Sequence, residues 1–340
     1  MLFWTIRVGL ALGVLVLLGL VGERIAEAID ARRLPAPGRM VDIGGWRSLH
    51  LLCEGDEAAP AIVVEQGAGE PAILWRGLQK QAAAFARFCL YDRAGYGWSP
   101  PAPAFQPIEE RAADLHRLLK SAGVTGPYIL VAHSYGGLVV RAFARAFPRD
   151  TAGIVMVDAI EESIAFHPDY LAFIRQSRPF VAAMRAAAAL GVMRLVGALS
   201  GGRREGGAIA PGDERLAAAV TARPSFFAAI AGDLESIEAA AASPANALPE
   251  GMGSLGDMPL VAITHGKPFP GPFARLEPFW LPGQQRMASL SSRGRLIVAE
   301  ASNHMIHQDQ PDLVLAALRS VVEQAGRQEG GPPAVEVSGR

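Results

Sequence analysis

The sequence is short of the residues on which several common classes of protein depend. It has only two cysteines in 340 residues, too few for a scaffold built on disulfides. Neither a C-x-x-C nor an H-E-x-x-H pattern occurs, so we expect no zinc or other metal site. The formal net charge is -1, and without a basic excess we expect no nucleic-acid partner. Half of the residues are apolar, which is enough to build a large buried core.

Long apolar runs are also absent, with one exception at the N-terminus. The run from Val8 to Gly22 is unbroken, and a helix from Leu2 to Gly22 would reach about 30 Å, the thickness of a bilayer core. We therefore predict a transmembrane anchor or signal segment over residues 1–23, followed by a linker over 24–39.

Cleavage of this segment is the main alternative. Ala26-Glu27-Ala28 has the small-x-small form of a signal-peptidase site, and cleavage there would give a secreted protein. Two charged residues, Glu23 and Arg24, separate the apolar run from that site, so we favour a retained anchor. The charges on the two flanks do not settle the orientation. We favour the exported, periplasmic side for the rest of the chain.

Beyond the linker, short apolar runs alternate with segments of helical periodicity. This alternation predicts an α/β fold with a mainly parallel, doubly wound sheet. About a hundred residues in the middle have helical patterns only, and we interpret them as an inserted helical cap. The predicted organisation is a core formed by residues 40–160 and 258–326, a cap over 161–257, and a disordered tail over 327–340.

The most informative stretch is the apolar strand from Tyr128 to Ala132, followed by His133-Ser134-Tyr135-Gly136 and an amphipathic helix. A small-x-Ser-x-Gly pattern between a strand and a helix is typical of a nucleophile elbow, a sharp turn that exposes the serine hydroxyl. Small residues two places before and after the serine allow that turn, and here they are Ala132 and Gly136. Ser134 is therefore the predicted nucleophile.

With this elbow and four further motifs in order, the chain resembles the alpha/beta-hydrolase superfamily. Within it, the chain is most similar to membrane-anchored bacterial serine hydrolases of mostly unassigned substrate. The resemblance covers about residues 40 to 325. The other motifs are Glu65-Gln66-Gly67-Ala68-Gly69, Tyr91-Asp92-Arg93-Ala94-Gly95-Tyr96-Gly97-Trp98-Ser99, Val157-Asp158-Ala159 and Asn303-His304.

The resemblance implies a base and an acid for Ser134. His304 follows the last strand and precedes the final helix, as the family's catalytic histidine does, and His307 is the runner-up. Most relatives carry the acid after the strand that here is Pro259 to Thr264, but no Asp or Glu occurs from Pro259 through Leu276. In some relatives the acid follows the preceding strand, where this chain has Asp158. We therefore expect Asp158 to orient His304.

The family also implies an oxyanion hole made of two backbone amides. One would belong to Tyr135, directly after the nucleophile, and the other to Ala68. Relatives usually have His-Gly-x at the second place, whereas this chain has Gln66-Gly67-Ala68. We further expect Gln66 and Gly67 in the substrate-binding loop, and Tyr96 and Trp98 at the rim of the pocket.

The cap has a helical stripe of apolar residues between Phe180 and Leu199, with Arg178, Arg185 and Arg194 on other faces. It can be a helix that packs on the core, an apolar lid over the serine, or a basic amphipathic surface that lies on lipid. An apolar lid would favour acyl or aryl esters as substrates.

Cys53 and Cys89 fall on strands that are antiparallel neighbours in this fold. Facing residues there lie about 4.5–5.5 Å apart, within the range of a disulfide. We expect them to pair if the domain is exported.

Together these features predict a serine hydrolase of the carboxylesterase type that acts on a small apolar ester and needs no cofactor. A peptidase, thioesterase or lactonase variant is an alternative within the same mechanism. A different class of protein, a catalytically idle receptor for an apolar ligand, is suggested by the absence of an acid at its usual place.

Overall fold

The core of the protein is a single sheet of eight strands in the order β1-β2-β4-β3-β5-β6-β7-β8. The computed structural model describes residues 2–102, 105–199, 209–243 and 255–329. β2 runs antiparallel to β1 and β4, and all other neighbours are parallel. The strands are β1 (Arg39–Gly44), β2 (Arg47–Glu54), β3 (Ala61–Glu65), β4 (Arg87–Tyr91), β5 (Tyr128–His133), β6 (Thr151–Val157), β7 (Leu260–His265) and β8 (Gly294–Ala299).

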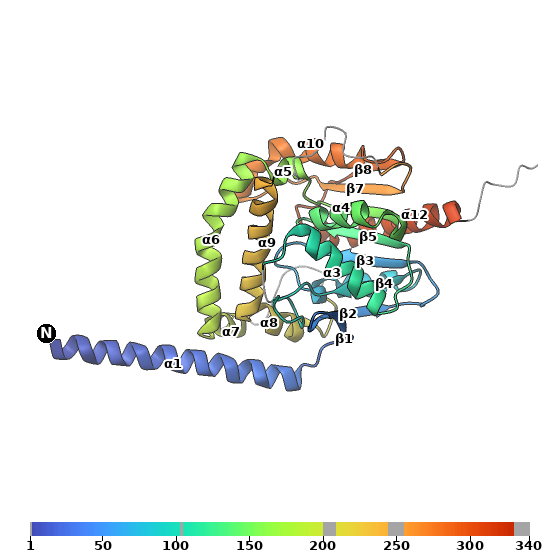
Figure 1. Ribbon diagram of the computed structural model, residues 1–340. Coiled ribbons are helices and arrows are strands. Elements are labelled where there is room, and N and C mark those ends of the chain that lie inside the picture. The colour runs from blue at the N-terminus through green and yellow to red at the C-terminus, as the bar shows by residue number, and fades with distance from the viewer. Residues whose placement is uncertain (1, 103–104, 200–208, 244–254, 330–340) are drawn as a thin grey trace, which may run out of the picture.

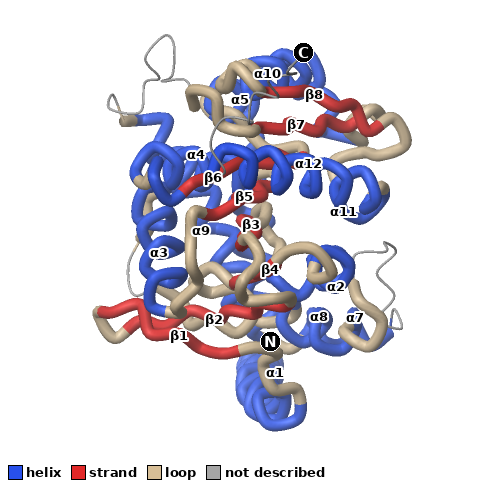
Figure 2. The backbone as a smooth tube through the Cα atoms, turned by 90° about the vertical axis from the view of Figure 1, so that its right-hand side faces the viewer, coloured by secondary structure: helices blue, strands red, loops and turns tan. Residues whose placement is uncertain are grey.

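Helices cover both faces of this sheet, which explains why β3, β4, β5 and β7 are buried along their whole length. α3, α4 and α10 contribute to one hydrophobic core, and α2 and α12 to the other. Figure 2 shows helices on both sides of the sheet. The predicted α/β class with a doubly wound sheet is thus confirmed. These helices, with the short α11, are α2 (Arg76–Ala82), α3 (Ile108–Ser121), α4 (Gly136–Ala146), α10 (Glu277–Ala288), α11 (Ile306–Asp309) and α12 (Pro311–Glu329).

A helical insertion separates β6 from β7, at the place where the sequence predicts a cap. Its two long helices, α6 and α9, stand side by side beyond the sheet (Figure 1). The insertion consists of α5 (Glu162–Ala165), α6 (Pro168–Ala189), α7 (Val192–Leu199), α8 (Glu214–Thr221) and α9 (Pro224–Ala242). Residues 200–208 and 244–254 of the predicted cap, and 330–340 of the predicted tail, lie outside the described residues.

The N-terminal segment forms one continuous helix, α1 (Leu2–Arg33), which extends through the first part of the segment predicted as a linker. Its apolar side chains, such as Leu15 and Leu18, are largely exposed. Among the described residues, α1 is the one single helix long and apolar enough to cross a bilayer; α6 and α7 would qualify only if this pair, bent by 85°, were one span. The N-terminal half of α1 projects beyond the rest of the molecule (Figure 1).

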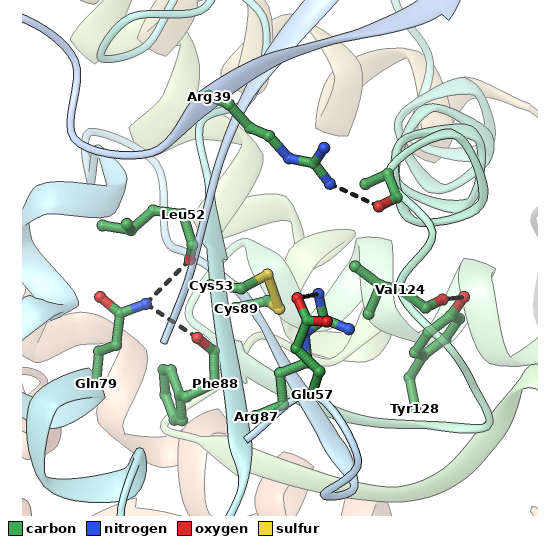
Figure 3. Close-up of a disulfide and its surroundings, with 11 residues drawn as sticks. Arg39, Leu52, Cys53, Glu57, Gln79, Arg87, Phe88, Cys89, Val124 and Tyr128 are labelled. Atoms are coloured by element: carbon green, nitrogen blue, oxygen red, sulfur yellow. Dashed lines mark hydrogen bonds and ion pairs between the residues drawn. A yellow bond between two sulfur atoms is a disulfide. The ribbon is translucent and has the colours of Figure 1, made fainter. Parts of the chain in front are cut away.

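Cys53 and Cys89 form the disulfide that the strand order predicts. They face each other in the antiparallel pair of β2 and β4, with their Cα atoms 4.0 Å apart (Figure 3). Near them, Gln79 donates hydrogen bonds to the carbonyls of Leu52 and Phe88, on the same two strands. The disulfide therefore joins β2 to β4 within the sheet, and β3 lies between β4 and β5, the strand that leads to Ser134.

Candidate active site

Ser134 occupies a sharp turn between β5 and α4. Its φ of 49° is in the left-handed region, which is costly for any residue other than glycine. A Cβ at Gly136 would lie 2.2 Å from the carbonyl oxygen of Glu65, so only glycine lets the turn approach β3 this closely. The carbonyl of Ser134 accepts hydrogen bonds from Gly137 and Ile160. The strand-turn-helix context that a nucleophile elbow requires is thus present.

Asp158 follows β6 and brings its carboxylate to His304. Asp158 also has a left-handed φ, 45°, and is fully buried. The Nδ1 atom of His304 lies 2.6 Å from Oδ2 of Asp158. Among the described residues, Nε2 of His304 has no hydrogen-bond partner, so this nitrogen is available to a nucleophile.

The carboxylate of Asp158 has further partners. Trp280 donates its indole N–H to Oδ1 at 2.8 Å, and Nδ1 of His265 lies 2.8 Å from Oδ2. Burial opposes ionisation of Asp158, but the hydrogen bonds and charges of His265 and His304 outweigh it and hold the pKa of Asp158 well below its usual value. It is therefore a carboxylate at neutral pH.

The contact between His265 and Asp158 was not predicted from the sequence. His265 is the last residue of β7, at the end of the strand where most relatives carry the acid, and its Nε2 lies 3.2 Å from Glu277. A signal was available in the sequence: the ends of β6 and β7 are neighbours, so a polar residue at the end of β7 lies within reach of an acid that follows β6.

His304 is the residue whose protonation state matters most. Burial lowers its pKa below the usual value of 6.5; the nearby Asp158 raises it, and the charge of His133 lowers it further. The net direction is downward, so His304 is neutral at pH 7 and can accept a proton.

Ser134 and His304 line the same cavity, which has a volume of about 370 Å³. No hydrogen bond joins the two side chains among the described residues, and such bonds commonly tighten only when substrate is bound. Leu74, Ile209 and Met305 supply apolar surface. The full lining is Gly67, Ala68, Gly69, Glu70, Leu74, His133, Ser134, Ile209, His304, Met305 and Gln308.

The backbone amides of Ala68 and Tyr135 have the freedom that an oxyanion hole requires. Within the described part of the chain, neither amide donates a hydrogen bond to another group. Arg93 fixes the loop before Ala68, because its guanidinium donates to the carbonyls of Gln66 and Gly67 at 2.7 and 2.9 Å. These two hydrogen bonds hold the loop in place, and Ala68, the next residue, lines the cavity.

The other residues expected at the pocket have mostly different surroundings. Gly67 lines the cavity, whereas Gln66, Tyr96 and Trp98 are not part of its described lining. The side-chain amide of Gln66 donates to the carbonyl of Tyr91, and the ring of Trp98 packs against His50. The hydroxyl of Tyr96 accepts from the amide of Gly69 and donates to a buried aspartate. The side chains of Gln66, Tyr96 and Trp98 therefore pack within the loops around the site and do not form the rim of the pocket.

A second buried pair, Glu70 and His133, joins the loop of residues 66–69 to the loop that carries His304. Nδ1 of His133 lies 2.9 Å from Oε2 of Glu70, and Nε2 lies 2.9 Å from the carbonyl oxygen of His304. Both partners are acceptors, so both ring nitrogens carry protons and His133 is an imidazolium. Glu70 also accepts the amide of Gly67. Burial opposes both charges, but the pair itself raises the pKa of His133 and lowers that of Glu70.

Together with His307, these two residues bring their ligand atoms within 4.8 Å of one another, close enough to hold a metal ion. The contacts of His133 favour the ion pair instead, because an imidazolium has no lone pair for a metal. His307 stacks on Trp75, with ring centroids 3.9 Å apart, and burial lowers its pKa to about 3, so this ring is neutral. Sequence reasoning missed the cluster because its members are far apart along the chain.

The described apolar stripe of the cap does not cover Ser134. Phe180, Leu195 and Leu199 are each more than half exposed, and the cap contributes only Ile209 to the described cavity lining. Of the three interpretations of this stripe, the lid over Ser134 is therefore wrong for the described residues. Helical periodicity predicts an apolar face, but not which surface that face meets.

Comparison with known proteins places the chain in a family. A model of the Alpha/beta hydrolase family matches residues 62–317. The chain belongs to this family. Over 130 residues it is 36% identical to "Probable transporter efuK" of Hormonema carpetanum, covering 36% of this chain and 18% of that protein. The chain spans less than half the length of the first curated relatives it matches.

Solved structures agree with this assignment at the level of the fold. A thermophilic esterase from Thermogutta terrifontis has a TM-score of 0.60 at 19% identity and covers 85% of this chain and 99% of its own. A structure reported for novel epoxide hydrolases from hot-environment metagenomes has a TM-score of 0.64 at 19% identity and covers 84% and 97%. At such identities the likeness shows the fold and does not identify the substrate.

Proposed function

We propose that this hydrolase cleaves carboxylic esters through a triad of Ser134, His304 and Asp158. The observation that carries the proposal is the 2.6 Å contact between Asp158 and Nδ1 of His304 at the cavity that also contains Ser134. The left-handed turn at Ser134 supports the same role for the serine.

In this mechanism the oxygen of Ser134 attacks the acyl carbon while Nε2 of His304 takes the serine proton. The amides of Ala68 and Tyr135 stabilise the resulting oxyanion. His304 then gives its proton to the departing alcohol, which leaves an acyl-enzyme on Ser134. A water molecule, deprotonated by His304, attacks the acyl carbon, and the acid leaves as the proton returns to Ser134. Asp158 remains a carboxylate throughout and stabilises the imidazolium.

The substrate in this proposal is a small ester with an apolar acyl or aryl part. Leu74, Ile209 and Met305 offer apolar contacts, and about 370 Å³ lies within the range of small-molecule sites. An aspartate nucleophile, as epoxide hydrolysis in this fold requires, is absent from the elbow. We further propose that α1 is retained as a membrane anchor with the hydrolase on the exported side. The disulfide supports export, because disulfides persist in oxidising compartments.

The test is hydrolysis of p-nitrophenyl esters of increasing acyl length by the full chain in neutral detergent. We expect turnover by the wild type and none above background by Ser134→Ala. Ser289→Ala, a change at the exposed serine that caps the C-terminal end of α10, is the matched control and should be fully active. Equal rates for wild type and Ser134→Ala would overturn the proposal.

Asp158→Asn separates this enzyme from an idle receptor for an apolar ligand. An amide cannot favour the required tautomer of His304, so kcat should fall by about 10³–10⁴-fold. Binding of a non-hydrolysable apolar ligand should change little. Glu300→Gln removes an exposed acid from the loop before His304 and should change neither kcat nor the binding of the ligand. Full activity in Asp158→Asn would remove Asp158 from the mechanism.

A further inference from the structure

A second cavity lies where α1 meets the cap, away from Ser134. Its volume is about 790 Å³, and its walls come from α1, α6 and α9. Apolar residues such as Leu20, Val181 and Phe227 form much of the surface. The complete lining is Leu20, Glu23, Arg24, Arg175, Arg178, Pro179, Val181, Ala182, Arg185, Ala186, Ala189, Pro224, Phe227 and Ala231. It shares no residue with the lining of the catalytic cavity.

The charge at this cavity is predominantly positive. Four arginines line it, and its single acid, Glu23, is bound by Arg194 of α7 at 2.7 Å. Arg24 pairs with Glu27, and Arg178 pairs with Glu238. In the part of the chain that the structure describes, Arg175 and Arg185 form no ion pair. Two uncompensated guanidinium groups beside an apolar wall match an anionic head attached to an apolar tail.

The position of the cavity along α1 indicates where such a ligand would come from. The unbroken apolar run of α1 ends at Gly22, and Leu20, Glu23 and Arg24 line the cavity. The cap contacts α1 at the same level, because a Cβ on Gly19 would lie 3.0 Å from the carbonyl oxygen of Leu190. If α1 spans the bilayer, this level coincides with the lipid headgroups.

The surface beside the cavity has the composition of a membrane contact. Val192, Leu195, Val196 and Leu199 of α7 are all exposed, and Leu199 is 79% exposed. α7 lies next to α1 (Figure 1). Arg194 of α7 pairs with Glu23 and Asp30, which follow the apolar run of α1. α7 therefore lies directly beyond that run, at the surface of a bilayer that surrounds it. A short helix with such a face rests at the boundary between headgroups and acyl chains.

We propose that the cavity between α1 and the cap binds the headgroup of an anionic phospholipid from the bilayer. Arg175 and Arg185, which both line the cavity, supply the positive charge that attracts the phosphate, and α7 rests on the acyl chains beside it. The cap is thereby docked on the membrane at a fixed height. The inference rests on the retained anchor of the proposed function, but not on the triad or on the substrate.

The experiment is native mass spectrometry of the full chain in neutral detergent, titrated with phosphatidylglycerol or with phosphatidylcholine of the same acyl chains. We expect one phosphatidylglycerol to be retained in preference to phosphatidylcholine. Arg175→Gln/Arg185→Gln should weaken phosphatidylglycerol binding roughly thirtyfold, because each arginine favours an anionic lipid. Arg149→Gln/Arg215→Gln removes the same charge from exposed positions outside the cavity lining and should bind like the wild type.

Three results would overturn the proposal: equal retention of the two lipids, unchanged binding in Arg175→Gln/Arg185→Gln, or displacement of the lipid by millimolar inorganic phosphate. The last result would identify a site for free anions. Ester hydrolysis, measured on the same samples, should be equal in both double variants and the wild type. Lost lipid binding with intact hydrolysis supports the lipid site, whereas absent hydrolysis in every sample would refute the proposed function alone.

Discussion

Two buried carboxylates each hold one histidine beside Ser134, and the two imidazoles differ in charge. Asp158 contacts His304, which is neutral, and Glu70 contacts His133, which is an imidazolium. The ring centroids of His133 and His304 are 4.6 Å apart. A positive charge this close disfavours a second one, so His133 helps to keep the base unprotonated.

The pH dependence of activity tests this coupling. His304 must be neutral to act, so kcat/KM should rise with pH and reach half its maximum below pH 6.5, because the pKa of His304 is lowered. His133→Gln removes the neighbouring charge, and the acidic limb should therefore move to higher pH. His307→Gln removes a neutral ring of the same cluster and should leave the limb in place. A shift in the opposite direction in His133→Gln would contradict the assigned charge of His133.

The same ion pair affects stability in a defined pH window. The pKa of Glu70 is lowered, so its contribution is present above the unfolded pKa and is lost as the pH falls through the folded value. The pKa of His133 is raised, so its contribution is present below the unfolded pKa and is lost as the pH rises through the folded value. The pair therefore stabilises the fold most at a pH above the unfolded pKa of Glu70 and below the unfolded pKa of His133.

At this scale the sequence predicts what a short motif contains and misses what separate segments bring together. Ala132 and Gly136 flank Ser134 in one stretch, so the elbow is visible in the sequence. Asp158 could be placed through the family resemblance, because some relatives carry the acid after the strand that precedes the cap. The ion pair of Glu70 and His133 joins two loops, and no local pattern indicates it.

Among the elements, α9 is the part of the cap that is tied most firmly to the core. Asp233 of α9 is fully buried and forms ion pairs with Arg93 at 2.9 Å and Arg111 at 2.8 Å. It also accepts the hydroxyl of Tyr96. Arg93 in turn holds the loop of residues 66–69 through Gln66 and Gly67. The cap and the loop are therefore linked through Arg93, and also through Tyr96, which accepts from the amide of Gly69.

Asp233→Asn should destabilise the protein strongly. It leaves two buried arginines without their shared acid, and breaking a buried pair in this way costs about 3–5 kcal/mol. Urea denaturation followed by circular dichroism measures the change in the free energy of unfolding. Glu235→Gln, two residues further along α9 and exposed, is the matched control. Equal stability of Asp233→Asn and wild type would show that this network does not hold the cap.

The sequence predicted that the cap is helical but not how its helices are oriented. The apolar residues of α7 recur at helical spacing, which is equally compatible with packing on the core, with a lid and with lipid. The contacts of Glu23 with Arg194, and of Gly19 with Leu190, bring α7 beside α1. These contacts join segments far apart in the chain, beyond the reach of periodicity.

Across the whole molecule, the fold class was the most predictable feature. Alternating strands and helices predict the doubly wound sheet, and the family resemblance places the strands of Cys53 and Cys89 side by side, where the structure shows the two residues facing each other. The length of α1 was not predicted, since the helix continues beyond its apolar run to Arg33. The charged residues beyond Gly22 are compatible with a helix, and one of them, Asp30, pairs with Arg194.

The disulfide gives a prediction for the whole fold. Protein from its native compartment, analysed without reductant, should be lighter by two hydrogen atoms than the reduced chain. Cys53→Ser/Cys89→Ser should lose about 3–4 kcal/mol of stability in urea denaturation, because the bond closes a long loop in the unfolded chain. Two free thiols in that protein would contradict export through an oxidising compartment.

The central claim is that Ser134 is an activated nucleophile, and labelling with a fluorophosphonate probe tests it most directly. The full chain in neutral detergent is incubated with the probe, and its intact mass is measured beside that of Ser134→Ala. The account predicts a single adduct on the wild type and none on the variant. A folded wild type that takes up no probe, or an adduct that persists in Ser134→Ala, would contradict it.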